Sequence, residues 1–157
     1  MMGPVDPALR DALAKQFPDV FAAEGDLDPN GVVVPAELHV ALAKTLKESF
    51  GFTLYVSVIA TNFPTSDGET YEVATVLRNP TTAQPFWWRV RLGADPQLAT
   101  LYPLFAGADW QEREQFDLLG VNFVDHPDMR RLMLSEDWEG FPLRKSYAID
   151  TPHTPWR

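Results

Sequence analysis

Apolar residues in the first third of the chain recur at the spacing of two amphipathic helices. The first stripe follows Asp6, which can cap a helix, and Pro7, which suits the first helical position. Its members are Leu9, Leu13 and Phe17, and we expect Pro18 to end that segment. The second stripe begins after Pro35, ends at Gly51 as a left-handed cap, and consists of Leu38, Leu42, Leu46 and Phe50.

Strand-like runs occupy the middle of the chain. A short run covers residues 32–34, and three longer ones cover residues 52–61, 71–78 and 86–92, separated by turn sequences. In the run 52–61, alternation places Leu54 and Val56 on the same face as Phe52. Consecutive strands on short connections predict an antiparallel meander. A further short helix is expected at about Gln97 to Leu101.

These elements predict an α+β fold: an antiparallel sheet of about four strands covered by two helices. An extended C-terminal segment with a short helix follows. The sequence becomes dense in charged residues after Phe105, so we expect an α+β domain over residues 1–107 and a partner-docking segment over residues 108–157.

Composition narrows the classes of function. The chain of 157 residues has a net charge of -9, which disfavours binding to nucleic acid or directly to anionic lipid. It has no cysteine, so thiolate ligation of an iron–sulfur cluster, disulfides and cysteine nucleophiles are excluded. We find no signal-peptide pattern and no apolar stretch long enough to span a bilayer. The expected location is cytosolic, or at a membrane through another protein.

The charged helix expected over residues 109–120 is the most informative part of the sequence. Asp109 is the expected N-cap, with Glu112 completing a capping box and Gly120 ending the helix. Arg113 and Asp117 are four residues apart and are expected to pair along its surface. Because its apolar stripe is narrow, we expect this helix to gain more from a second protein than from its own domain.

The segment containing this helix resembles the signature of the 30 kDa (C) subunit family of respiratory complex I, the NADH–quinone oxidoreductase. The resemblance covers residues 108–147. It rests on Ala108 to Trp110, Glu112 to Glu114, Asp117 to Leu119, His126, Arg130, Leu132, Met133 and Asp137 to Lys145. Three positions depart from the family pattern, namely Leu119, Phe141 and Ser146, where an aromatic residue, His and Asp are more usual.

The resemblance implies a non-catalytic structural and assembly subunit of the peripheral arm of a proton-translocating enzyme. It implies docking on the quinone-site large subunit, next to the neighbouring iron–sulfur subunits of complex I, on the cytoplasmic side of the bacterial cell membrane. FMN, iron–sulfur clusters and quinone would belong to partner chains, with no cofactor, catalytic residue or metal site in this one. Membrane association would come only through the complex.

Sixteen residues of the signature are expected at the partner interface. They are Glu112, Arg113, Glu114, Asp117, Gly120, His126, Pro127, Arg130, Arg131, Leu132, Asp137, Trp138, Pro142, Leu143, Arg144 and Lys145. If Arg131 pairs with the partner, Arg131→Ala should weaken incorporation into the complex and leave the melting temperature of the isolated chain unchanged.

Other interpretations remain open at this point. An equivalent subunit of an energy-converting hydrogenase or another donor dehydrogenase would carry a similar signature. A free-standing hydrolase using Glu112 or Glu114 is disfavoured, because residues two apart on a helix face different ways. A co-chaperone is suggested only by the tripeptide 126–128, which here follows an acidic helix. His39, His126 and His153 are too scattered for a metal site.

Overall fold

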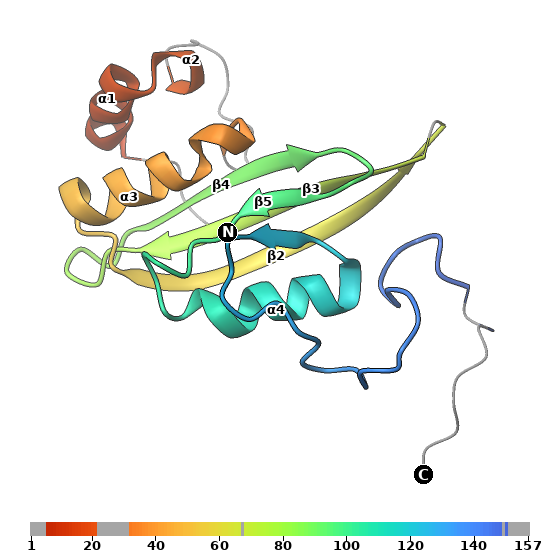
Figure 1. Cartoon of the computed structure of the whole chain (residues 1–157). Helices are drawn as coiled ribbons and strands as arrows, with labels where there is room; N and C mark the ends of the chain where they lie inside the picture. Colours follow the sequence, from red (N-terminus) through yellow and green to blue (C-terminus); the bar gives the residue numbers. More distant parts are fainter. Residues whose placement is uncertain (1–5, 22–31, 67, 149, 151–157) are drawn as a thin grey trace.

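The computed structural model describes residues 6–21, 32–66, 68–148 and 150, and Figure 1 shows their arrangement. Helix α1 (Pro7–Gln16) begins as predicted, because the Asp6 carboxylate accepts a hydrogen bond from the backbone N–H of Ala8 at 2.9 Å. A single further turn, α2 (Pro18–Phe21), follows. A 3-10 turn, η1 (Ala36–Leu38), leads into α3 (His39–Phe50), which ends at Gly51 with a φ of 72°. Both predicted helices are confirmed.

One mixed sheet of four strands forms the centre of the fold. Its strands are β1 (Val32–Val33), β2 (Leu54–Thr65), β3 (Gly68–Arg78) and β4 (Pro85–Leu92), in the order β1-β4-β3-β2. The meander β2-β3-β4 is antiparallel, as predicted. The first strand is parallel to β4, so the sheet is not wholly antiparallel. Between β1 and β4 the chain passes through η1, α3, β2 and β3, and it then enters β4 in the same direction as β1.

The helices α1, α2 and α3 lie on one face of this sheet, near one end of it (Figure 1). On that face the fully buried Trp88 donates a hydrogen bond from Nε1 to Nδ1 of His39 at 3.0 Å. The rings of Phe21 and Phe52 pack against Phe86 between helix and sheet. We refer to this side of the sheet as the covered face.

The face predicted for Leu54 and Val56 is wrong. The register of β2 against β3 shifts between Tyr55 and Ser57, where a β-bulge inserts an extra residue. Tyr55 and Val58 therefore both point to the covered face, three residues apart. Leu54 and Val56 remain 48% and 43% exposed on the other side.

The expected helix at residues 97–101 is absent, and a strand takes its place. The strand β5 (Gln97–Ala99) pairs in parallel with β6 (Asn122–Val124) in a separate sheet. Leu98 and its register partner Phe123 are both buried, so the ladder carries its own apolar contact.

The core continues across the predicted boundary at residue 107. Helix α4 (Ala108–Leu119) runs along β2, and its ends Ala108 and Leu119 are buried in the same apolar cluster as Phe105 and Leu92. Residues 108–124 therefore fold as part of the main core. No helix in the described part of the chain is long and apolar enough to cross a bilayer. The docking role expected for residues 108–157 remains a prediction.

Candidate functional site: the C-terminal segment

Helix α4 covers the free edge of β2 with two glutamine side chains. Gln111 accepts a hydrogen bond from the N–H of Val58 at 3.1 Å, and Gln115 accepts one from the N–H of Ala60 at 2.9 Å. An uncovered edge strand is a template for pairing with another chain. The two amides, one helical turn apart, occupy part of that template. This stretch of the edge is therefore covered by the chain's own helix.

The expected capping box of this helix is wrong. The N-cap is Gly107, no side chain caps the helix, and Asp109 lies inside the first turn. The Glu112 carboxylate turns inward, is 1% exposed, and accepts hydrogen bonds from the Thr100 hydroxyl and from the N–H of Leu101, the latter at 2.9 Å. Burial raises the pKa of Glu112 to about 7, although these two hydrogen bonds act in the opposite direction. Glu112 thus ties α4 to the chain that follows β5.

The second buried carboxylate on the helix, Asp117, binds the segment that returns along α4. One of its oxygens accepts hydrogen bonds from three successive backbone N–H groups, those of Leu132, Met133 and Leu134, at 3.0, 2.6 and 2.9 Å. Burial acts to raise the pKa of Asp117, but these bonds and Arg131 outweigh burial and hold it below its ordinary value. A charged carboxylate is therefore the centre of a small anion-binding loop.

Arg131 completes this arrangement from the other side. Its guanidinium donates to Asp117 Oδ1 at 2.7 Å and to the carbonyl oxygens of Trp138 and Gly140 at 3.0 and 2.9 Å. Arg113, which was expected to pair with Asp117, instead donates to the carbonyl of Arg130 at 3.2 Å. The predicted pair of Arg113 and Asp117 does not form because the returning segment supplies Asp117 with four hydrogen-bond donors, namely Arg131 and three backbone N–H groups. An ion pair between neighbours on the helix surface would stabilise the helix much less.

The end of the helix is locked by a close contact at Gly120. This residue has a φ of 76°, and a Cβ built there would lie 2.2 Å from Arg144 Nη2 and 2.7 Å from the ring of Phe141. Arg144 Nε donates to the carbonyl of Leu119 at 2.8 Å, and its guanidinium lies 4.3 Å from the Phe141 ring centroid. The Phe141 ring also meets Phe116 edge-on. Phe141, one of the departures from the family pattern, therefore packs between the helix and Arg144.

His126 lies in the turn after β6, and its side chain is fully buried. Its Nδ1 accepts a hydrogen bond from the N–H of Asp128 at 3.1 Å, and its Nε2 lies 3.4 Å from Asp109 Oδ1. The ring also packs 5.7 Å from that of Tyr102. These contacts predict a structural role for His126, which holds the turn against the start of α4.

The sixteen predicted interface residues thus differ widely in exposure. Two are buried, Glu112 and Asp117. Nine are partly buried as whole residues, although the side chain of His126 is itself fully buried: Arg113, Glu114, Gly120, His126, Arg131, Leu132, Trp138, Pro142 and Arg144. Five are exposed: Pro127, Arg130, Asp137, Leu143 and Lys145. Exposed Arg130 itself bonds Asp128 through two nitrogens, at 2.5 and 2.8 Å.

The premise that these charges find partners only on another protein is therefore wrong. Arg113, Arg130, Arg131 and Arg144 all have acceptors within this chain. Arg113, Arg131 and Arg144 fasten the segment onto α4, Arg130 bonds Asp128 within the segment, and these charges do not by themselves indicate a partner. The assignment of the sixteen residues to an interface remains a prediction.

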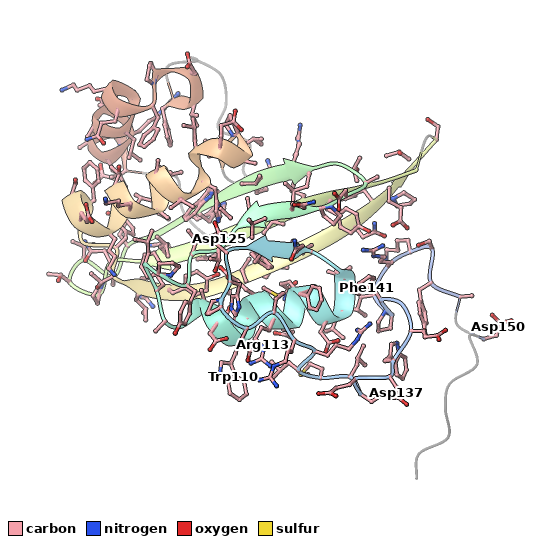
Figure 2. The ribbon with its side chains drawn as sticks, in the orientation of Figure 1. Trp110, Arg113, Asp125, Asp137, Phe141 and Asp150 are labelled. Atoms are coloured by element: carbon pink, nitrogen blue, oxygen red, sulfur yellow. The ribbon has the colours of Figure 1, made fainter. Side chains whose placement is uncertain are left out.

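Large apolar side chains on this segment do face solvent. Trp110, Met133 and Leu143 are 66%, 63% and 55% exposed. Figure 2 shows Trp110 projecting from α4 away from the body of the protein, next to Arg113. Because the segment beneath them is fastened by internal bonds, these side chains are presented on a fixed support. They are the groups here that would gain most from contact with another protein.

Sequence reasoning missed the residues that bind backbone. Gln111, Gln115 and Asn62 accept hydrogen bonds from backbone N–H groups, Asn62 from that of Lys145 at 2.7 Å. Thr100 was missed as the partner of Glu112. The only signal for the glutamines was their spacing of four residues on one helix. Among the residues that the structure describes, no group of three or more His, Asp or Glu side chains is arranged to hold a metal ion.

The structure thus defines a class: an α+β domain whose C-terminal segment is fastened along one sheet edge by buried carboxylates. Residues 32–153 match the family of the respiratory-chain NADH dehydrogenase 30 kDa subunit. The C subunit of NADH-quinone oxidoreductase from Moorella thermoacetica is 37% identical over 142 residues, which cover 88% of this chain and 93% of the relative. Its counterpart from Geotalea uraniireducens is 33% identical over 149 residues, 92% of this chain and 86% of the relative.

A relative that matches a shorter stretch of the sequence and two solved structures agree with this family match. The J subunit of NAD(P)H-quinone oxidoreductase from Synechococcus sp. (strain RCC307) is 60% identical over 54 residues, 34% of this chain and 31% of the relative. The solved trypsin-resistant fragment of Nqo5 is 26% identical with a TM-score of 0.56, and the match covers 77% of this chain and 96% of the fragment. A chain of an archaeal membrane-bound sulfane sulfur reductase shares the fold, with a TM-score of 0.68 at 22% identity over 88% of this chain and 85% of that one.

The chain belongs to the complex I 30 kDa subunit family. It is therefore a subunit of an NADH–quinone oxidoreductase-type complex of the respiratory chain.

Proposed function

We propose that this chain is a non-catalytic docking subunit of the peripheral arm, seated on the quinone-site large subunit and next to iron–sulfur subunits. In this position it supports electron transfer from NADH to quinone on the cytoplasmic side of the membrane, and partner chains carry FMN, the iron–sulfur clusters and quinone. The observation that carries the proposal is the fastened C-terminal segment. Its four arginines, Arg113, Arg130, Arg131 and Arg144, have acceptors within the chain, while Trp110, Met133 and Leu143 remain exposed on it.

A rigid support reduces the entropy lost on binding, so the segment is suited to docking. The hydrolase alternative requires the carboxylates of Glu112 and Glu114, which are not positioned for general acid–base catalysis. Glu112 is enclosed by Thr100 and Leu101, and Glu114 lies on a different face of α4. These positions favour a binding role over the hydrolase alternative.

The test is affinity purification of the tagged chain from native membranes in mild detergent. The proposal predicts that the quinone-site large subunit and iron–sulfur subunits purify with it. NADH-binding flavoprotein subunits in the same fraction support NADH as donor, whereas a nickel-site large subunit identifies a hydrogenase. Recovery of the chain alone, under conditions that keep the other subunits together, would contradict the docking role.

Trp110→Ala supplies a matched variant for the same purification. Because Trp110 is 66% exposed, its truncation should leave the melting temperature of the chain unchanged. We expect it to lower co-purification about tenfold or more if Trp110 is buried by the partner. Full co-purification of this variant would show that Trp110 is not part of the interface.

A further inference from the structure

The second face of the sheet, opposite the covered face, carries no layer of secondary structure in the described part of the chain. Cross-strand neighbours share a face, so the register places Ile59, Ala74 and Arg89 in one row. Thr61, Glu72 and Arg91 form the next row in the same way. The contacts of α3, and those of residues 144–145 with Tyr71 and Asn62, all lie on the covered face. We call the second side the open face.

The open face exposes large apolar side chains along β2. Leu54, Val56, Ile59 and Phe63 are 48%, 43%, 55% and 46% exposed. Scattered single apolar residues are normal on a protein surface, whereas a row of four along one strand is typical of a surface that another molecule covers. The β-bulge at Tyr55 and Ser57 contributes directly, because it turns Leu54 and Val56 outward.

The charge of the open face is opposite to that of the whole chain. Among the described residues, the exposed charged side chains of this face on β3 and β4 are two arginines, Arg78 and Arg91, in a chain of net charge -9. Glu72 bonds Arg89 at 3.0 Å and Arg91 at 3.4 Å, which holds both guanidinium groups along the sheet. A partner that fits this face carries carboxylates around an apolar surface.

Two hollows lie at the two ends of this surface. One is lined by Leu54, Tyr55, Val56, Val76, Arg78, Ala83 and Pro85. The other is lined by Phe63, Thr70, Tyr71, Glu72, Arg91 and Leu92. Each hollow combines an apolar wall with an arginine, which is the chemistry that receives an apolar side chain beside a carboxylate.

We propose that the open face is a second docking surface, and that its occupant is a folded partner subunit presenting apolar side chains bordered by carboxylates. The proposal rests on the proposed function, because it takes the partner to be a subunit of the same complex. It extends contact to a face outside the signature segment. A second copy of this chain fits less well, because it would bring the same excess of arginines to the interface.

Site-specific photo-crosslinking within the assembled complex tests the occupant. A benzoylphenylalanine probe replaces Phe63 on the open face, and in a matched control it replaces Ala41, which is exposed on α3 over the covered face. The proposal predicts crosslinks from position 63 to another subunit of the complex, at a site whose neighbours include Asp or Glu, and none to that site from position 41. A crosslink between two copies of this chain, or equal yields from both positions, would overturn it.

Two substitutions test the surface chemistry in the same complex. Ile59→Glu should lower incorporation about tenfold or more, and Ala41→Glu should not, because only the first adds charge to the proposed interface. Arg91→Glu should lower incorporation, and Arg91→Lys should restore most of it. Melting of each purified full-length variant, within about 2 °C of the unsubstituted chain, shows that the fold is intact.

The two proposals fail in different ways. If the unsubstituted chain does not purify with other subunits, the docking function fails. If it does purify with them, and Ile59→Glu and Arg91→Glu also incorporate normally, the open face is not an interface and the docking function stands.

Discussion

Arg131 donates a hydrogen bond of 2.7 Å to the buried carboxylate of Asp117, fourteen residues earlier in the chain. This contact joins the segment that follows the core to the helix that covers part of the sheet edge. Three backbone N–H groups share the same carboxylate. Each partner therefore depends on the other for compensation of its charge.

Asp117→Asn should destabilise the isolated chain by about 3–5 kcal/mol, because Arg131 then faces a neutral group and three N–H groups lose an anionic acceptor. Urea unfolding of the purified full chain measures the loss. Asp125→Asn is the matched control and should be nearly neutral, since Asp125 is exposed and has a φ of 65°, a conformation that Asn adopts readily. Equal stability of the two variants would contradict the role given to Asp117.

Arg131→Ala should lower the melting temperature of the isolated chain, which reverses the expectation drawn from sequence. The guanidinium links Asp117 to the carbonyls of Trp138 and Gly140, so its removal releases both ends of the segment. Differential scanning calorimetry of the isolated chain measures the change. An unchanged melting temperature would show that Arg131 does not stabilise the isolated chain and would favour a contact with another protein instead.

Gly120→Ala should cost several kcal/mol, about 1–2 from the left-handed backbone and more from overlap with Arg144 and Phe141. Gly93→Ala serves as control, because a Cβ at Gly93 meets no atom within 4 Å. Chemical denaturation of both variants gives the comparison. A Gly120→Ala chain as stable as Gly93→Ala would show that Arg144 and Phe141 do not occupy these positions.

Two buried groups give opposite dependences of stability on pH. Burial lowers the pKa of His39 to about 4 from its ordinary 6.5, so the unfolded chain binds a proton that the folded chain does not. Stability linked to His39 is complete above pH 6.5 and is lost as the pH falls toward 4, by up to about 1.4 kcal/mol per pH unit. His39→Gln should remove this dependence and still offer Trp88 an acceptor.

Glu112 acts in the other direction. Its pKa is raised from 4.5 to about 7, so the folded chain keeps a proton that the unfolded chain releases. The stability linked to Glu112 is complete below pH 4.5 and is lost as the pH rises through 7. Glu112→Gln should therefore show stability rising with pH from 4.5 to 6.5, and His39→Gln stability falling there. If both variants keep the pH profile of the unsubstituted chain, neither group is buried as described.

Local signals predicted much of the fold. The cap at Asp6, the stripe along α3, the left-handed Gly51 and the meander each depend on neighbours in sequence, and all are confirmed. The bulge at Tyr55 and the strand at Gln97 depend on distant partners, β3 and β6 respectively. A periodicity argument has no access to those partners, so it assigned the wrong face and the wrong element.

The sequence predicted where in the chain the candidate site lies, at residues 108–147, but it did not predict the contacts that its side chains make. The signature at residues 108–147 identified the family that the comparisons confirm. Apart from the expected pair of Arg113 and Asp117, its charges were assigned to a partner protein because each was considered on its own helix or turn. The backbone N–H groups that bind Asp117 and Glu112 come from residues 11 to 17 positions away. Only the folded chain brings those groups to the helix.

Amide hydrogen exchange of the isolated full-length chain measures the fastening of the segment most directly. The amides of Leu132, Met133 and Leu134 should exchange far more slowly than unstructured amides, and Asp117→Asn should remove that protection while the amides of β3 stay protected. Exchange of the three amides at the unstructured rate in the unsubstituted chain, beside a protected β3, would contradict the account.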